Sequence, residues 1–353
     1  MTHSTDSAVR MTIGLDVGDK TTHFCALGSD AVLGRGKFPT TRDALLRDLA
    51  AYRGAQVVLE AGSQSSWMSR CLESAGFKVH IADPRRVQLL TKDPRKTDRR
   101  DAETLARMER GMPELLGTIY HRGEQAQADL ALVRARDQLV QARASLVRFV
   151  RGTVKLFGVR LPSGSTRGFS KSVRELIPPV VQPAIHVVLD QLDALCLAIR
   201  ELERRIATLA DGRYPEIVKV QEVGGVGPIT AAAFVLTIED PKRFASSRRV
   251  GSWIGLCPRS HASGDKDPDL GISKSGDRHL RGLLVQCAQH ILGPFGQDSD
   301  LRRFGLRLAA RGGRAAKRRS VVAVARKLAV LLHLLWRRGA TYDPLHSASR
   351  QAA

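Results

Sequence analysis

Two aspartates, Asp98 and Asp101, stand three residues apart in the run Lys-Thr-Asp-Arg-Arg-Asp-Ala at 96–102. On an α-helix, residues i and i+3 share a face, so both carboxylates can point at one place. The helical pattern continues to Met108, with Thr97 as the expected N-cap. Such a pair can hold a metal ion, but acids in a first helical turn also serve as partners of the helix dipole. The pair alone leaves both interpretations open.

Two further acids lie upstream in stretches that are otherwise apolar. Asp16 falls within the strand-like segment 11–20, and Glu60 ends the apolar segment 56–60. A carboxylate inside an apolar strand loses solvation or changes its pKa unless it is paired or bound to a metal. We therefore expect Asp16 and Glu60 to have partners.

The segments that must position these acids alternate between strand and helix patterns, which predicts an α/β sheet. Glu60 then stands at the carboxyl end of its strand, where the ligands of open α/β sheets gather. The expected strands are 11–20, 22–27, 31–38, 56–60 and 78–81, and the expected helices between them are 44–50 and 67–75.

This order resembles that of the RNase H-like nucleases, in which acids on the first and fourth strands and on a later helix bind two Mg²⁺ ions. Asp16, Glu60, Asp98 and Asp101 fit that arrangement. Carboxylate oxygens are ligands that Mg²⁺ prefers. Two such ions roughly 4 Å apart would stabilise the attacking and leaving oxygens of an in-line phosphoryl displacement.

The chain carries a net charge of +21 over 353 residues. Neutralisation of phosphates is the commonest reason for such an excess, so we expect a nucleic-acid partner. A solvated basic face would also explain a basic run, but a long run of one sign repels itself unless a polyanion screens it. The longest such run has no acid and contains twelve basic residues, namely Arg302, Arg303, Arg307, Arg311, Arg314, Lys317, Arg318, Arg319, Arg326, Lys327, Arg337 and Arg338.

The bulk composition, with 43% hydrophobic and 26% charged residues, is that of a soluble protein with two or three domains. Charged residues break the longest apolar run, 321–336, and the first ten residues hold no hydrophobic signal segment. We therefore expect no membrane association and a cytoplasmic location. Five cysteines lie far apart without a Cys-x-x-Cys pair, which argues against a zinc knuckle or a disulfide framework and predicts core residues or free thiols.

Two long helical segments follow the acid-bearing part. Apolar residues step by three and four along both, which is the pattern of a heptad seam. A proline-rich stretch over 162–183 lets the chain double back. The seam does not decide between a hairpin within one chain and a coiled coil between subunits. The expected seam residues are Leu132, Ala135, Leu139, Ala142, Leu146 and Phe149, then Val188, Leu192, Leu195, Ile199, Leu202, Ile206 and Leu209.

A glycine-rich turn opens the C-terminal part. The segment 220–233 contains Gly225 and Gly227 and resembles a helix-hairpin-helix element, whose free amides face a phosphate at a helix N-terminus. A short helix over 247–254 is followed by a loop in which Ser263 precedes a glycine, and then by a basic helix. A serine beside a glycine is ordinarily only a turn.

Together these motifs resemble the DEDD insertion-sequence transposases, family 110 of the bacterial insertion sequences, which are bridge-RNA-guided recombinases related to a pilin-gene invertase. The resemblance runs from residue 11 to residue 345. The motifs that carry it, in order, are Ile13-Gly14-Leu15-Asp16, Leu59-Glu60-Ala61-Gly62, 96–102, 224–228, 255–258, Ser263-Gly264, 272–277 and Leu280-Arg281.

The resemblance implies an α/β, RNase H-like (RuvC-like) N-terminal domain, a helical coiled-coil spacer and a mainly helical C-terminal transposase domain. We place these at 11–120, 121–212 and 213–345, with disordered tails at 1–10 and 346–353.

The resemblance also implies that Asp16, Glu60, Asp98 and Asp101 hold Mg²⁺, or Mn²⁺, and that Ser263 becomes joined to a DNA 5′ phosphate. A serine hydroxyl needs activation, which a metal-rich carboxylate cluster can provide. The implied partners are donor and target DNA, a structured bridge RNA and further copies of the chain, as a homodimer assembling into a homotetramer at the bacterial nucleoid. We expect nucleic-acid contacts at Gly225, Gly227, Arg259, Lys274, Arg278, Arg281, Arg314, Lys317, Arg318 and Arg319.

Three functions compete for this pattern. The first is an RNA-guided serine recombinase, the second a metal-dependent, Holliday-junction resolvase-like nuclease that uses water and only the four acids, and the third a non-catalytic nucleic-acid-binding protein. Ser263 and the additional C-terminal domain count against the second, and four acids in RNase H order count against the third. Ser260 is the rival nucleophile, but the Ser-Gly pair favours Ser263.

Overall fold

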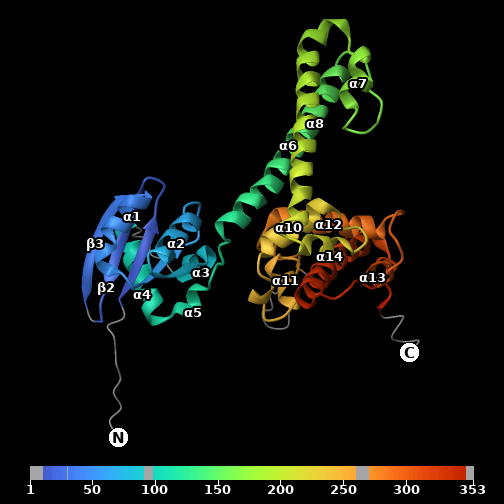
Figure 1. The fold of residues 1–353 in the computed structure, drawn as a ribbon. Helices are drawn as coiled ribbons and strands as arrows, with labels where there is room; N and C mark the ends of the chain where they lie inside the picture. Colours follow the sequence, from blue (N-terminus) through green and yellow to red (C-terminus); the bar gives the residue numbers. More distant parts are fainter. Residues whose placement is uncertain (1–10, 30, 91–97, 260–269, 347–353) are drawn as a thin grey trace. The chain divides into compact units, whose positions relative to one another are not determined.

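The computed structural model describes residues 11–29, 31–90, 98–259 and 270–346 (Figure 1). The chain divides into two units, residues 1–124 and 125–353. All strands found in the described ranges belong to the first unit. The described secondary-structure elements of the second unit are helices, apart from a bridge between Pro258 and Ile272.

The first unit is built from a sheet and its covering helices. Its strands are β1 (Thr12–Val17), β2 (Thr21–Leu27), β3 (Val32–Pro39), β4 (Gln56–Glu60) and β5 (Lys78–Ala82), and its helices are α1 (Arg42–Asp48), α2 (Ser65–Ser74), α3 (Pro84–Leu90), α4 (Asp98–Gly111) and α5 (Pro113–Leu116). The strand order is β3-β2-β1-β4-β5. Tight turns make β1, β2 and β3 antiparallel, whereas helical connections let β4 and β5 run parallel to β1. The predicted α/β sheet is therefore confirmed, and its strand pairing is mixed.

Helices cover both faces of this sheet. On one face, α1 and α2 close an apolar core around Ile13, Leu15 and Leu59. On the other face, α4 packs on the middle of the sheet, where Ala102 and Ala106 contact the buried side chains of β2, while α3 and α5 pack beside it. The small residues on α4 allow its backbone to approach the strands closely.

A helical hairpin begins the second unit. The long helices α6 (Glu124–Lys155) and α8 (Gln182–Asp211) lie side by side, with the short α7 (Phe169–Val173) packed against them (Figure 1). The packing is within one chain, because Val150 of α6 and Leu189 of α8 share a core cluster and Arg136 pairs with Glu203 at 2.7 Å. The hairpin alternative therefore describes these helices.

The predicted seam is right for α8 and only partly right for α6, where Leu132 and Leu146 pack against core clusters. In α8, Leu192, Ile199, Ile206 and Leu209 are buried. In α6, the predicted seam residue Phe149 is 53% exposed. Two adjacent apolar stripes run along α6, and periodicity alone could not tell which one faces α8. The buried stripe of α6 consists of Leu130, Val133, Val147, Val150 and Val154.

Six further α-helices lie in the described residues of the second unit. They are α9 (Glu216–Gln221), α10 (Pro228–Ile238), α11 (Arg248–Trp253), α12 (Arg278–Leu292), α13 (Asp300–Ala309) and α14 (Gly313–Arg338). Every residue of α10 from Thr230 to Ile238 is buried, as in a central core helix. The predicted helix at 247–254 corresponds to α11.

By length and composition, the stretch Pro179–Asp211 would suffice to cross a membrane, and it is the one such helix among the described residues. Its apolar side is used inside the protein, where Ile185 and Leu192 enter the hairpin core and Ile206 enters the C-terminal core. The five cysteines are free thiols, three of them buried, as predicted.

Candidate functional site

Asp16 and Glu60 lie side by side at one edge of the sheet. Strands β1 and β4 pair in parallel with Leu15 opposite Leu59, so the next residues, Asp16 and Glu60, occupy equivalent positions about 4.8 Å apart. Side chains alternate along a strand, so both acids point to the face that carries Val58, which is covered by α4. Asp16 is half-buried and Glu60 is exposed.

Helix α4 crosses this face with its first turn at the same edge. Its backbone rests on Gly14 of β1, where a Cβ would lie 2.0 Å from the carbonyl oxygen of Ala102. At its other end, Arg110 donates to the carbonyl oxygen of Ser29 at 3.0 Å. Ser29 follows β2 near the first residue of β1, at the opposite edge. Therefore α4 runs antiparallel to β1, and Asp101 in its first turn lies at the edge of the two strand acids.

These carboxylates are oxygen donors of the kind that Mg²⁺ prefers. Among the described residues, no three His, Cys, Asp or Glu side chains are gathered closely enough to form a metal centre. Asp98 begins α4, but its side chain and the predicted N-cap Thr97 lie outside the described part of the chain. The donor set fits a hard divalent cation in kind, and metal binding by the four acids stays a prediction.

Two pairs that the sequence pattern did not reveal hold α4 on the sheet. Glu103 accepts from Arg35 of β3 at 2.6 Å. Glu109 accepts from Nδ1 of His80 on β5, while Nε2 of His80 donates to the carbonyl oxygen of Gly117 at 3.0 Å. An acceptor at each ring nitrogen favours the imidazolium, and the hydrogen bond with Glu109 raises the pKa of His80.

A serine and a histidine hold the loop that follows Glu60. The Ser65 hydroxyl donates to the carbonyl oxygen of Gly62 at 2.8 Å and accepts from the Gly62 amide at 2.9 Å. Because the hydroxyl hydrogen is used, Nε2 of His121, 2.8 Å away, is assigned as the donor. Burial lowers the pKa of His121 and favours this neutral ring. The Gly-x-x-Ser spacing before α2 signals such a turn, but nothing in the sequence singles out His121.

The predicted nucleophile Ser263 and the rival three residues before it lie outside the described residues. On either side of that segment, Pro258 and Ile272 form an antiparallel bridge. The Arg259 amide also donates to the carbonyl oxygen of Gly271 at 3.1 Å. The two ends of the serine-bearing segment are therefore held next to each other.

The two predicted glycine contacts differ in their surroundings. Gly225 has φ of +90°, and a Cβ there would lie 2.9 Å from Cγ1 of Ile291 on α12. The geometry thus assigns Gly225 to close helix packing. At Gly227 a Cβ would meet nothing within 4 Å, and this residue is the N-cap of α10, with no side-chain capping hydrogen bond. A phosphate contact at the first turn of α10, which the sequence predicts for Gly227, stays a prediction.

The predicted basic contacts divide into one internally bonded residue and several exposed ones. Arg281 donates to the carbonyl oxygens of Ile254 and Ser275 at 2.9 and 2.8 Å, and burial lowers its pKa. Its guanidinium thus has a structural role that the sequence did not indicate. Seven others have exposed side chains, namely Arg259, Lys274, Arg278, Arg314, Lys317, Arg318 and Arg319.

Known families match both parts of the chain. Residues 13–158 match a DEDD family model of IS110 type described as "Transposase", and residues 219–301 match one described as "Transposase IS116/IS110/IS902 family". The transposase for insertion sequence element IS1328 of Yersinia enterocolitica is 31% identical over 282 residues, which is 78% of this chain and 82% of the relative. The transposase for IS1111A of Coxiella burnetii is 30% identical over 300 residues, 83% and 81% of the two chains.

A pilin gene-inverting protein of Moraxella lacunata is similar over a shorter stretch, at 28% identity over 124 residues, 34% of this chain and 37% of the relative. The two family models match the chain in the expected order. This result agrees with the acids at the sheet edge of the first unit and with the basic residues of the helical second unit. The chain belongs to the IS110 family of DEDD insertion-sequence transposases, which are enzymes of DNA recombination.

Proposed function

We propose that this transposase cuts and rejoins donor and target DNA through a covalent 5′-phosphoserine intermediate on Ser263. In this proposal Asp16, Glu60, Asp98 and Asp101 hold Mg²⁺ or Mn²⁺. The observation that supports it most is the parallel pairing of β1 with β4, which brings two strand acids to the edge where α4 begins.

In the proposed cleavage, Oγ of Ser263 attacks the scissile phosphorus while the bond from phosphorus to the 3′ oxygen breaks. The 5′ phosphate stays on the serine, and the serine proton ends on the leaving oxygen, which becomes a 3′ hydroxyl. In rejoining, a 3′ hydroxyl of the other DNA attacks the phosphoserine, and its proton returns to Oγ. One phosphoester replaces another at each step, so no ATP is consumed. A divalent cation, when bound, supplies stabilisation of the negative charge on the phosphate oxygens.

The residues around the acids would act by positioning them. Gly14 admits the α4 backbone to the sheet, and the pair of His80 with Glu109 fixes the later part of α4. Ser65 and His121 fix the loop after Glu60. Groups held in advance by such contacts need little reorganisation during phosphoryl transfer.

The partners in this proposal are two DNA duplexes, a structured bridge RNA and a homodimer that assembles into a homotetramer at the nucleoid in the cytoplasm. Support for the DNA comes from the net charge of +21 and the exposed cations of α14. The Moraxella relatives are named for inverting a pilin gene, which fits recombination between two DNA sites. The proposal of an RNA partner is supported by the family resemblance. Recombination that is equally fast without the RNA would exclude a role for it as a guide.

The test halts the reaction on a nicked DNA substrate and looks, after denaturation, for protein attached to a DNA 5′ end. Ser263→Ala should abolish this adduct and recombination together, whereas Ser260→Ala and Ser273→Ala should still form it. Asp101→Asn should abolish cleavage and leave DNA binding nearly intact, because it removes a metal ligand but no surface cation. If Ser263→Ala cleaves at the wild-type rate and no adduct forms, water is the nucleophile and the chain is a resolvase-like nuclease.

A further inference from the structure

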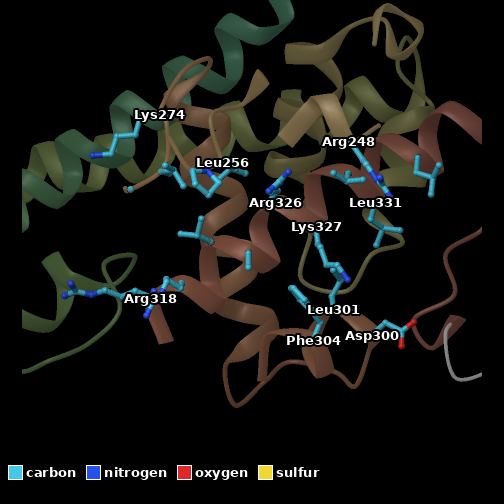
Figure 2. A pocket seen from close by; sticks show the side chains of 18 of the residues that line it. Arg248, Leu256, Lys274, Asp300, Leu301, Phe304, Arg318, Arg326, Lys327 and Leu331 are labelled. Atoms are coloured by element: carbon cyan, nitrogen blue, oxygen red, sulfur yellow. The ribbon is translucent and has the colours of Figure 1, made fainter. Parts of the chain in front are cut away.

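An open pocket of about 1430 Å³ lies in the second unit between α13, α14 and the chain on either side of the Pro258–Ile272 bridge (Figure 2). It exceeds the roughly 300–1,000 Å³ of most small-molecule sites. Its floor is apolar and includes Leu256, Phe304 and Leu331. The proposed strand chemistry gives this floor no role.

Basic side chains also line the pocket. They are Arg248, Lys274, Arg318, Arg319, Arg326 and Lys327, against two lining acids, Asp300 and Asp343. Within the described ranges, no carboxylate lies at ion-pair distance from Arg248, Lys274, Arg318 or Arg326. The ammonium of Lys327 lies 4.0 Å from the centre of the Phe304 ring. Positive charge and an aromatic face therefore meet inside the pocket, where Figure 2 labels both side chains.

We propose that this pocket binds a short single-stranded stretch of substrate DNA, with bases on the apolar floor and phosphates at the basic rim. In a duplex the base faces are stacked inside, so phosphate contacts need cations alone. Unpaired bases expose flat apolar faces, and these bind best where aromatic and apolar side chains lie within a cationic groove. An apolar protein segment would match the floor but would leave Arg248, Lys274, Arg318 and Arg326 without a carboxylate or phosphate partner.

The occupant is DNA because the walls offer few neutral polar groups to a ribose 2′ hydroxyl. The inference rests on the proposed function, in which cleavage and strand exchange free single strands near the protein. It concerns binding alone, and Asp101→Asn should therefore bind the strand as the wild type does. A cleavage assay tests the catalytic proposal, whereas a binding assay with a single strand tests the proposal of a single-strand pocket.

The test uses the full chain and three fluorescent probes of about 12 nucleotides, a length near one single-strand site. They are a mixed-sequence DNA strand, the same strand with central abasic positions, and the corresponding duplex. Phe304→Ala should weaken binding of the intact strand about tenfold, because one stacked base is lost. It should weaken binding of the abasic strand much less, and leave duplex binding unchanged. The control is Leu306→Ala, which removes an exposed apolar side chain of the same helix outside the pocket.

A second variant does not touch the floor. Arg326→Glu should weaken binding of the strand several-fold more than Arg338→Glu, which makes the same charge change on the same helix outside the pocket. Equal effects of these two variants, or equal losses by Phe304→Ala on the intact and abasic strands, would overturn the proposal. Tighter binding of an RNA strand of the same sequence would overturn the choice of DNA. Loss of self-association in Phe304→Ala with unchanged strand binding would show that a second copy of the chain covers the floor instead.

Discussion

Replacing Gly14 by alanine should disturb the acidic edge while the fold survives. A Cβ at this position would lie 2.0 Å from the carbonyl oxygen of Ala102 and 2.7 Å from the amide nitrogen of Ala106. Both are backbone atoms of α4, so no side-chain rotation relieves the contact. Helix α4 must move away by about 1.4 Å to restore an ordinary contact of 3.4 Å. Overpacking of this kind costs roughly 1–3 kcal/mol of stability.

The same displacement carries Asp101 away from Asp16 and Glu60. A misplacement of about 1 Å can lower a catalytic rate on the order of 100-fold, so single-turnover cleavage of an end-labelled duplex should fall by about two orders of magnitude, with duplex binding unchanged. Gly62→Ala is the matched control, because this residue closely follows Glu60 and a Cβ there meets nothing within 4 Å. Wild-type cleavage by Gly14→Ala would refute the view that the seating of α4 on β1 sets the geometry of the acids.

Three further outcomes are expected. Glu109→Gln should lower the free energy of unfolding by about 3 kcal/mol. The folded-state pKa of His80 is raised from 6.5. The stabilisation by the His80–Glu109 pair is therefore complete below pH 6.5 and is lost as pH rises through the folded-state pKa. Urea unfolding of Glu109→Gln at several pH values should not show this loss. Arg281→Ala should lower the melting temperature and leave the slope of log affinity against log salt unchanged, since its guanidinium bonds internal carbonyls; a smaller slope would show that it contacts DNA. Alanine at the four exposed cations should reduce that slope on duplex DNA by about 0.9 per lost phosphate contact, and an unchanged slope would place them on a solvent face. The four are Arg314, Lys317, Arg318 and Arg319.

The sheet and its acids could be predicted because their signals are local. Apolar runs that end at turn residues predicted the bounds of β4, Gln56–Glu60, correctly. For most ends of the other strands, the predicted bound lies within two residues of the observed one. Once β1 and β4 are taken as parallel neighbours, Asp16 and Glu60 must share an edge. The start of α4 at Asp98 followed in the same way from the acid spacing.

The rest depended on which surfaces meet in three dimensions. The pairing of His80 with Glu109 joins β5 to α4, and the sequence offers no pattern that links them. The sequence does not distinguish Arg281 from an exposed basic residue, because the carbonyl oxygens that accept its hydrogen bonds approach it only in the folded chain. On α6, neighbouring apolar stripes compete, and only the position of α8 decides that Val147 is buried and Phe149 is exposed.

The chain leaves the first unit directly after the residues that hold the loop following Glu60. His121 donates to Ser65, and the carbonyl oxygen of Arg122 accepts from Arg70 at 3.1 Å, just before α6 begins at residue 124. Tension applied along α6 would therefore act on these two hydrogen bonds before it acts on the sheet, which the chain contacts at Thr118 and Ile119. A force that pulls on the connecting chain therefore acts on the loop after Glu60 before it acts on any strand of the sheet.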